Sequence, residues 1–502
     1  MNPSQDTKLP PRRLRWLCIA YAFPPINRSG THRTLGFVQH LDRLGADATV
    51  LTVEPGQEPT DHVLLGKVPA STQVIRTQWA NLHAQVKTIV DGRWSRDDCG
   101  RQTPRSSSDQ QESNDDNHSR NHHSPSLREW VSRALLTPDS RIGWIPPAVR
   151  AGLRAVRRSQ PDVIYSTSPY MSAHLIGLIL ARWTHKAWVA DFRDPWSGNP
   201  FRDLGFDSLK RWDAWLESLV VREASQVVCT TPTMTNDLCR RHPDIADKCV
   251  TILNGFDRER FTDLQPERSA GADEFVLIHC GQFYGPRSPK VWFEALSRAR
   301  VRSPLAAGRI RIVLVGPDHY DGTPLTQIAS DMGVGDCVDV LGNRSHAESL
   351  SLLAGGDALM LAGSDGPRND LQVPNKLYEY LAIRKPILAS FAPNNPTVDI
   401  LQEARAEAII CPPDDVEALS QAMIRLASRR NQVIDNAWSG VDRFDRARCA
   451  EQLLDIFQRV IRRRAPRRSK GSRRLKPAAR GMPNRVSAFG GVWSTTGLRT
   501  SE

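Results

Sequence analysis

Several motifs that mark well-known chemistries are missing from this chain of 502 residues. It contains no G-x-x-x-x-G-K-[ST] phosphate loop, no G-x-G-x-x-G, no H-E-x-x-H and no G-x-S-x-G. It also lacks a D-x-D pair, the two carboxylates with which metal-dependent sugar transferases commonly hold Mg²⁺ or Mn²⁺. These absences disfavour a kinase, a zinc hydrolase and a metal-dependent transferase, and to a lesser degree a dinucleotide oxidoreductase.

Long apolar runs and paired cysteines are also missing. The longest nearly apolar run, MSAHLIGLILARW, is too short to span a bilayer and contains His174. The nine cysteines are scattered singly with no C-x-x-C pair, which is typical of reduced thiols used as small core residues. We therefore expect a cytoplasmic protein without a targeting or transmembrane segment, with peripheral contact at the inner face of the membrane left open.

The net charge of +12 is carried almost entirely by the C-terminal end. Residues 462–502 contain twelve Lys and Arg and one acid, Glu502, which gives this tail +11 and leaves +1 for the rest. Its arginines alternate with Pro, Gly and Ser, so we expect a disordered tail that either contacts anionic membrane or merely aids solubility. Residues 95–126 contain no aliphatic or aromatic side chain and are predicted to be a disordered insert. Because the body is nearly neutral, no specific nucleic-acid partner is expected.

Strand-like apolar runs alternate with helical segments in two successive series. The first series runs from LRWLCIAY to CVTILN and ends at the turn NGFD, and the second has six strands from FVLIHCG to AIICP. Such alternation predicts parallel sheets with helices on both faces. We therefore predict an α/β fold of two doubly wound Rossmann-like domains, residues 14–255 and 256–445, followed by a helix over 446–461.

Four polar stretches follow predicted strands, at the sheet edge where doubly wound folds bind ligands. In YAFPPINRSGTHRT, Gly30 opens a helix with Arg33 in its first turn. A glycine there lets a phosphate approach backbone N–H groups, although an ordinary loop is the alternative. In HCGQFYGPRSPKVW, a loop leads through Arg287 and Lys290 into a helix, which suits a bound anion or simply solvent-exposed charge.

The third stretch, ADFRDPW, places Asp191, Arg193 and Asp194 directly after a strand that looks buried. Charged residues gathered in this way indicate either a functional site or a structural ion pair in which Arg193 neutralises one of the carboxylates.

The fourth stretch is VPNKLYEYLAIRKPILAS. Pro374 suits the first turn of a helix and Asn375 can cap it. Lys376 lies at the positive end of that helix, which is mildly unfavourable unless an anion is close. Glu379 lies on the same face, so a nucleotide could place its phosphates on Lys376 and its ribose on Glu379. A surface Lys–Glu pair is the alternative.

Together the stretches FPPINRSGTHR, TSPYMSAHLIGLILARW, ADFRDPW, NGFD and VPNKLYEYLAIRKPIL resemble the family 4 glycosyltransferases of the GT-B fold, particularly the bacterial polysaccharide-type members. The resemblance covers about Leu14 to Phe457, apart from the insert. It implies that the domains face a cleft, with the acceptor on the N-terminal domain, the donor on the C-terminal domain and the last helix returning to the N-terminal domain. The implied reaction is retaining transfer from a nucleoside-diphosphate sugar to a glycan or lipid-linked acceptor, in cell-surface polysaccharide synthesis, without metal or cofactor.

The resemblance also implies roles for single residues. Gly30 would lie over the donor phosphates with Arg33 nearby, and Glu379 would hold the ribose. Many relatives have Gly-Arg after the first strand of the second domain, where this chain has Gly281–Gln282, so Arg287 or Lys290 would bind the pyrophosphate. The first of two glutamates found in many relatives is absent, which leaves the sugar unassigned. The predicted donor-binding residues are Gly30, Arg33, Gly281, Arg287, Lys290, Asn375, Lys376 and Glu379.

The predicted catalytic residues are Asp191, Arg193 and Asp194. One of the two aspartates would orient the acceptor or steady positive charge on the sugar, while basic groups stabilise the leaving pyrophosphate. A nucleotide-sugar epimerase of the same architecture and a non-catalytic scaffold that binds nucleotide or RNA remain alternatives. In WIPPAVRAGLRAVRRSQ, several arginines on a short helix could rest on anionic lipid, but the same pattern describes any helix packed on a sheet.

Overall fold

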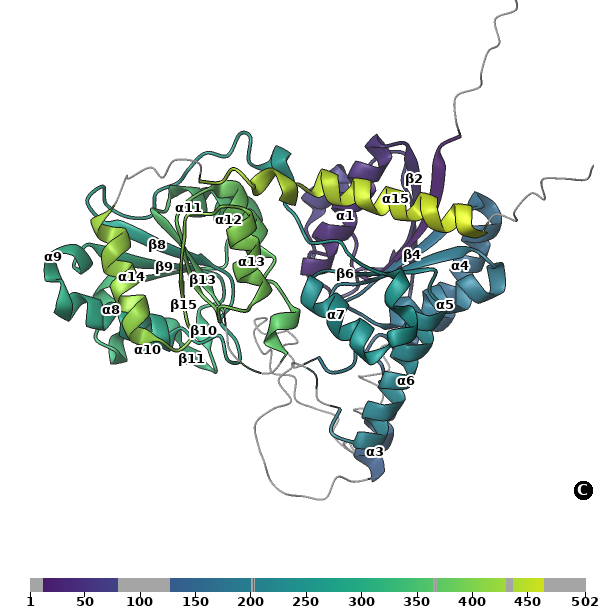
Figure 1. The fold of residues 1–502 in the computed structure, drawn as a ribbon, viewed down its shortest axis with the longest axis horizontal. Coiled ribbons are helices and arrows are strands. Elements are labelled where there is room, and N and C mark those ends of the chain that lie inside the picture. The colour runs from purple at the N-terminus through teal and green to yellow at the C-terminus, as the bar shows by residue number, and fades with distance from the viewer. Residues whose placement is uncertain are drawn as a thin grey trace, which may run out of the picture. The chain divides into compact units, whose positions relative to one another are not determined.

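The computed structural model describes residues 12–79, 127–199, 202, 204–363, 366, 368–429 and 437–464 (Figure 1). The described residues up to Arg464 belong to one compact unit. The predicted insert at 95–126 lies outside the described residues, and so does the predicted tail of 462–502 except for residues 462–464, which continue the preceding helix.

The first half of the chain builds a sheet of seven parallel strands in the order β3-β2-β1-β4-β5-β6-β7. The strands are β1 Leu14–Ala20, β2 Ala46–Val53, β3 Gln73–Thr77, β4 Val163–Thr167, β5 Ala187–Phe192, β6 Gln226–Cys229 and β7 Cys249–Thr251. The order reverses between β1 and β4, which is the position where doubly wound sheets open a crevice for ligands.

Both faces of this sheet are buried, as the continuous apolar composition of its strands requires. In β1, Leu17 and Ile19 join a core with α4 Ile145–Ser159, α5 Ser172–Thr184 and α6 Asp207–Glu223. Figure 1 shows these three helices in sequence along the sheet, and α5 contacts both α4 and α6. The alternate β1 residues Trp16, Cys18 and Ala20 join a second core with α1 Ser29–Arg43.

The last helix, α15 Arg446–Arg464, packs on the first sheet although it follows the second sheet in the chain. It lies against α1. Leu453, Phe457 and Val460 are buried in the same core as Trp16, whose ring lies 5.5 Å from that of Phe457. The apolar face of this helix therefore completes the core of a sheet that begins more than 400 residues earlier.

The second sheet has six parallel strands in the order β12-β9-β8-β13-β14-β15. They are β8 Phe275–Cys280, β9 Ile310–Val315, β12 Val338–Gly342, β13 Ala358–Ala362, β14 Ile387–Ser390 and β15 Ala408–Cys411. One face is covered by α8 Lys290–Arg302, α10 Leu325–Asp331 and α14 Val416–Ser428. The other carries α11 His346–Gly355, α12 Lys376–Ile383 and α13 Pro396–Glu403. Smaller elements are α7 Pro232–Arg241, α9 Pro304–Ala307 and the hairpin of β10 His319–Tyr320 with β11 Thr323–Pro324.

The predicted pair of parallel α/β sheets is confirmed, and all six strands predicted for the second sheet are found. Strand β3 and helix α3 Leu127–Leu135 were not predicted, and neither was the hairpin of β10 and β11. The first is a short edge strand, QVIRT, in which polar residues interrupt the apolar pattern. Helix α3 directly follows the polar insert, and no strand-like apolar run stands next to it that would have indicated a strand–helix unit.

Candidate active site

A cavity of about 300 Å³ lies where strands of both sheets end. The loop after β5, the loop after β8 and the segment that enters α12 each contribute to its wall. Six predicted site residues line it: Arg193, Asp194, Gly281, Arg287, Asn375 and Lys376. Residues as far apart in the chain as Arg193 and Lys376 thus line one cavity, because the carboxyl ends of parallel strands share a sheet edge.

Arg193 is buried, with 6% of its surface exposed, yet its side chain has no hydrogen-bond partner among the residues that the structure describes. Both Nε and Nη1 are left without an acceptor. Burial lowers the pKa of its guanidinium, and the charge of Asp194 opposes this shift. Arg193 is thus a cation in the cavity lining whose side chain no acceptor in the described part of the chain satisfies.

Arg33 is equally inaccessible but fully paired. Its Nε and Nη2 donate to the two oxygens of Asp191 at 3.1 and 2.9 Å, and Nη1 donates to the Oδ1 of Asn254 at 2.8 Å. Burial disfavours the charge, but Asp191 raises the pKa of this guanidinium. Arg33 is outside the cavity lining, and every one of its nitrogens already serves the protein.

Asp191 is the acceptor at the centre of this network. Its Oδ2 also accepts from the Tyr165 hydroxyl at 2.7 Å and from the Thr167 hydroxyl at 2.9 Å. Burial alone would raise the pKa of its carboxyl, but Arg33 and these hydrogen bonds hold it below the ordinary value. The structural ion pair considered for this stretch therefore exists, but its cation is Arg33 rather than Arg193.

Asp194 has the opposite environment. It lines the cavity, and burial raises the pKa of its carboxyl despite the nearby charge of Arg193. Gly30 lies directly beside this loop, because a Cβ on Gly30 would come within 2.8 Å of the Nη1 of Arg193. The absence of a side chain at Gly30 thus allows Arg193 to lie across the beginning of α1.

Lys376 begins α12 and forms no ion pair with a carboxylate that the structure describes, although Glu379 is close enough to favour its charge. Its Nζ lies 3.2 Å from the Nε2 of His279, and a Cβ on Gly281 would lie only 2.5 Å from that Nζ. Gly281 also has a φ of +131°, which side chains disfavour. Burial, followed by repulsion from Arg287, lowers the pKa of the Lys376 amine to about 8. Burial and Lys376 also lower the pKa of His279, so its ring is a neutral neighbour.

Arg287 and Lys290, the two alternatives for a pyrophosphate ligand, occupy different places. Arg287 lines the cavity, donates to the Tyr284 hydroxyl at 2.7 Å and has a buried Nε without a partner among the described residues. Lys290 is exposed at the start of α8 and is outside the lining.

Glu379 and Asn375 have partners that the sequence did not indicate. Glu379 is bonded to His346, with 2.7 Å between Oε1 and Nε2, so the surface pair of Glu379 with Lys376 is not formed. Asn375 does not cap α12 as expected, since its side chain makes no capping hydrogen bond. Its Oδ1 instead accepts from the Nδ2 of Asn254 at 2.8 Å.

Several lining residues were not predicted as site residues, namely Thr230, Thr231, Asn254, Gln282, Tyr284, Gln372, Val373 and Pro374. Thr230 and Thr231 directly follow β6, and Asn254 comes shortly after β7. Their position at strand ends was a signal that could have identified them. Of the predicted residues, Gly30, Arg33, Asp191, Lys290 and Glu379 do not line the cavity.

The described residues contain no group of three or more His, Cys, Asp or Glu side chains placed to hold a metal ion. None of the described helices is long and apolar enough to cross a membrane.

Two known families match this chain in succession. Residues 109–260 match Glycosyltransferase Family 4, and residues 274–429 match Glycosyl transferases group 1. A curated relative, the D-inositol 3-phosphate glycosyltransferase of Stackebrandtia nassauensis, is 27% identical over 275 residues. That match covers 51% of this chain and 60% of the relative, so less than two thirds of the relative's length is represented.

Solved structures share the fold at low identity. A glycosyltransferase from Rickettsia africae superposes with a TM-score of 0.57 at 14% identity, covering 89% of this chain and 99% of the other. An Anabaena protein crystallised with UDP superposes with a TM-score of 0.54 at 14% identity, covering 89% of this chain and 100% of the other. These likenesses confirm the predicted GT-B architecture of two parallel α/β sheets. Since the two family matches together cover more than half of its residues, the chain belongs to the family 4 glycosyltransferases.

Proposed function

We propose that this chain transfers a sugar from a nucleoside-diphosphate sugar to a hydroxyl of a glycan or lipid-linked acceptor, with retention of anomeric configuration. The observation that carries the proposal is the unpartnered, buried guanidinium of Arg193 in one cavity with Lys376 and Arg287. Arg193, Arg287 and Lys376 share the cavity with a single carboxylate, that of Asp194, so the excess positive charge calls for an anion of more than one charge. The donor pyrophosphate is such an anion.

The cations have a direct role in the reaction. The glycosidic bond to the pyrophosphate breaks as the anomeric carbon becomes positively charged, so negative charge grows on the leaving phosphate oxygens. Arg193, Arg287 and Lys376 are fixed before the reaction and stabilise that charge as it develops. Of the two alternatives for the pyrophosphate ligand, the proposal takes Arg287, because it lines the cavity and Lys290 does not.

Asp194 is the proposed catalytic carboxyl. It lines the cavity, whereas Asp191 uses its oxygens on Arg33, Tyr165 and Thr167 and acts as a positioning residue. Asp194 would orient the acceptor hydroxyl or face the positive charge on the sugar. Glu379, held by His346, is proposed to accept hydrogen bonds from the ribose.

The setting of the reaction is part of the proposal. We place the enzyme in the cytoplasm, in the synthesis of cell-surface polysaccharide. All eight cysteines in the described part of the chain are free thiols, which fits a reducing compartment. The curated relative named above acts, by its description, on D-inositol 3-phosphate, and a phosphorylated acceptor is one class to include in an acceptor screen.

Calorimetric titration of UDP, GDP, ADP and dTDP tests the donor site. One nucleotide is expected to bind the wild type well and Lys376→Ala at least tenfold more weakly, since a charge-assisted contact is lost. Glu379→Ala is expected to lose the contribution of the ribose. If no nucleotide binds, or if both variants bind as the wild type does, the proposal fails in favour of a scaffold.

Product analysis with the corresponding nucleotide sugars tests the reaction. A transferase gives at most slow hydrolysis until an acceptor is added. Conversion of the donor into another nucleotide sugar in the absence of acceptor would instead identify an epimerase.

A further inference from the structure

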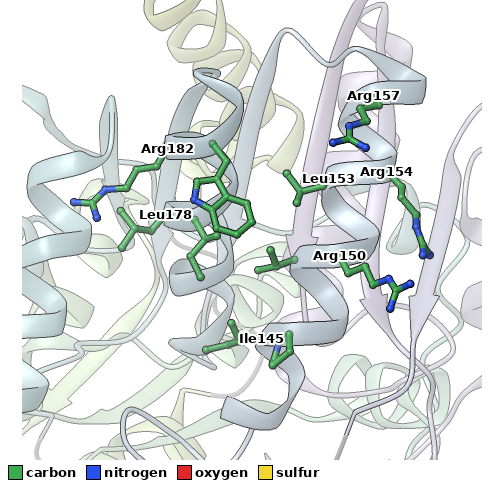
Figure 2. Close-up of a pocket in the computed structure, with 11 residues that line it drawn as sticks. Ile145, Arg150, Leu153, Arg154, Arg157, Leu178 and Arg182 are labelled. Atoms are coloured by element: carbon green, nitrogen blue, oxygen red, sulfur yellow. The ribbon is translucent and has the colours of Figure 1, made fainter.

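An exposed cation needs no partner inside the protein, whereas a cation in a cavity does. Arg150, Arg154 and Arg157 border a hollow of about 660 Å³ between α4 and α5 (Figure 2). Their side chains are exposed, so water satisfies their charge. The amine of Lys376 differs from them, because it lines the 300 Å³ cavity and burial disfavours its charge. Lys376 therefore depends on the groups that immediately surround it.

The hydrogen-bond partner of Lys376 among the described residues is a histidine ring. The Nζ of Lys376 lies 3.2 Å from the Nε2 of His279. His279 belongs to β8, and 1% of its surface is exposed. Phe275 and Leu277, which alternate with it along the strand, are apolar and join the core with α8 and α14. An apolar side chain would continue this pattern, so burial alone does not explain the imidazole.

The tautomer of the His279 ring follows from its second partner. Its Nδ1 lies 3.0 Å from the backbone oxygen of Met360 in β13. A carbonyl oxygen can only accept, so Nδ1 carries the proton and donates. Because burial and the charge of Lys376 lower the pKa of the ring, it holds no second proton. The Nε2 therefore presents a lone pair, and Lys376 is the donor in this hydrogen bond.

The surrounding residues fix the ring and the amine in this arrangement. The ring of Phe283 stacks on the imidazole, with 4.6 Å between centroids and 23° between planes. The Tyr380 hydroxyl, on the same helix as Lys376, donates to the same Met360 oxygen at 3.2 Å. A Cβ on Gly281 would lie 2.5 Å from the Lys376 Nζ, so the glycine leaves room for the amine. The geometry at Lys376 is thus built by β8, β13 and α12 together.

The other charged and titratable groups around Lys376 act on its charge in opposite directions. Arg287 disfavours the ammonium, while Cys280 and Glu379 favour it. Burial raises the pKa of the Cys280 thiol to about 12, which keeps the thiol neutral. Glu379 already has an ion-pair partner on α11. His279 therefore supplies the direct hydrogen bond that favours the ammonium form.

We propose that His279 is a positioning residue for the proposed sugar transfer, because its Nε2 lone pair keeps Lys376 charged and holds the ammonium at the cavity wall. The inference rests on the proposed function for the identity of the anion, which is the donor diphosphate. Arg193 and Asp194 line the same cavity from the loop after β5 and carry opposite charges. An apolar residue in place of His279 would keep the core but present the phosphates with an amine that is more often neutral.

Competitive labelling of the full-length protein with acetic anhydride tests this inference without any nucleotide. Only the neutral amine reacts, so labelling of the Lys376 peptide against pH, measured by mass spectrometry, gives the pKa of that amine. His279→Phe keeps an aromatic ring against Phe283 and removes the acceptor. We expect the pKa of Lys376 to fall from about 8 to about 7, which corresponds to one hydrogen bond to a charged group.

Calorimetry with the tightest binder among UDP, GDP, ADP and dTDP gives a second readout. Because the charged amine binds the diphosphate, His279→Phe should bind about eightfold more weakly than the wild type at about pH 8.5, and within about threefold at about pH 6. A merely structural role would weaken binding by the same factor at both pH values. If none of the four nucleotides binds, the proposed function fails, while the labelling still shows whether His279 sets the charge of Lys376.

Two amide variants separate the lone pair from packing. In His279→Gln the amide oxygen can reach the position of Nε2 and accept from Lys376, although the bond to Met360 is lost. In His279→Asn the amide takes the position of Nδ1, donates to Met360 and is too short to reach Lys376. His279→Gln should therefore bind nucleotide within about threefold of the wild type at both pH values, and His279→Asn should behave as His279→Phe.

His174 provides the matched control, because it is a similar histidine outside the cavity lining. It is 0% exposed, its Nδ1 lies 2.9 Å from the Ser166 hydroxyl and its ring stacks on Phe192 with 4.5 Å between centroids. Burial lowers the pKa of its ring as well. His174→Phe should leave both the pKa of Lys376 and the pH dependence of nucleotide binding as in the wild type.

Three outcomes would overturn the inference. An unchanged pKa of Lys376 in a folded His279→Phe protein would show that the ring does not set its charge. Equal changes in His279→Gln and His279→Phe would reduce the role of the ring to packing. A fall of the Lys376 pKa by the same amount in His174→Phe would mean that the loss of any buried imidazole has this effect. Thermal unfolding establishes that each variant is folded under the conditions compared.

Discussion

Two loops at the carboxyl edge of the first sheet each bury an arginine, and the two arginines have opposite surroundings. Arg33, at the beginning of α1, is 4% exposed and donates to acceptors from two separate segments, the end of β5 and the stretch after β7. Arg193, after β5, is 6% exposed and its Nε and Nη1 have no partner among the described residues. The pKa of the first is raised by Asp191 despite burial, and the pKa of the second is lowered by burial.

The difference distinguishes Arg33, which stabilises the fold, from Arg193, which we propose binds a ligand at the same edge of the sheet. Burying a charge without a partner costs several kcal/mol, so a chain tolerates it only where something else supplies the counter-charge. The Arg33–Asp191 pair supplies its own and holds α1, β5 and the segment after β7 together. We propose that a ligand supplies the counter-charge of Arg193.

The largest effect is expected on stability from Arg33→Met. The substitution leaves the carboxylate of Asp191 buried without its cation, so the free energy of unfolding should fall by about 3–5 kcal/mol. Urea denaturation followed by circular dichroism measures this. Arg193→Met is the control and should change stability by less than about 1 kcal/mol, in either direction. Similar losses in both variants would remove the distinction between the two arginines.

The next effect concerns turnover and compares the two aspartates. Once the donor is known, Asp194→Asn should lower kcat by about 10²–10³-fold while the protein unfolds as the wild type does. Asp191→Asn should lower stability first, because Arg33 loses its anion. Steady-state kinetics and a denaturation curve for each variant separate these results. Near-normal turnover of Asp194→Asn would withdraw its catalytic role.

A third prediction concerns pH and the amine of Lys376, whose pKa is about 8 in the free protein. A bound diphosphate favours the charged amine and raises that pKa, so nucleotide binding takes up a proton above pH 8. Affinity should be constant just below pH 8 and fall by up to about tenfold per unit above it. Calorimetry at about pH 9 in buffers of different ionisation enthalpy counts the proton. A flat affinity through this window would mean that Lys376 does not face the anion.

The smallest effect is expected at Lys290. It is exposed and outside the cavity lining, so Lys290→Ala should change nucleotide affinity by at most about 0.5 kcal/mol. Arg287→Ala, in the same loop, should lose more, because its guanidinium lines the cavity. Calorimetry of the two variants side by side decides between them, and a larger loss at Lys290 would reverse the assignment.

Local pattern was enough to predict most of the fold. Buried strands such as FVLIHC and IRIVLV are continuous apolar runs, which is how strands covered on both faces appear in sequence. The edge strand QVIRT was missed because a strand at the margin needs fewer apolar residues. The position of the site was predictable as well, because it follows from where parallel strands end.

Partners could not be predicted, because they come from distant parts of the chain. Arg33 and Asp191 are 158 residues apart, and Asn254 and Asn375 are 121 apart. The expected cap by Asn375 is not formed, because Asn375 has helical backbone angles and its Oδ1 accepts instead from Asn254. Whether a buried charge is satisfied depends on three-dimensional neighbours, and no local pattern contains that information.

We propose that the cations of the cavity bind a diphosphate, and calorimetric titration of the preferred nucleoside diphosphate into the wild type and Arg193→Met tests this. Arg193→Met should keep wild-type stability and lose about a hundredfold in affinity, as expected for a buried, charge-assisted contact. Unchanged affinity in a stable, folded Arg193→Met protein would contradict it.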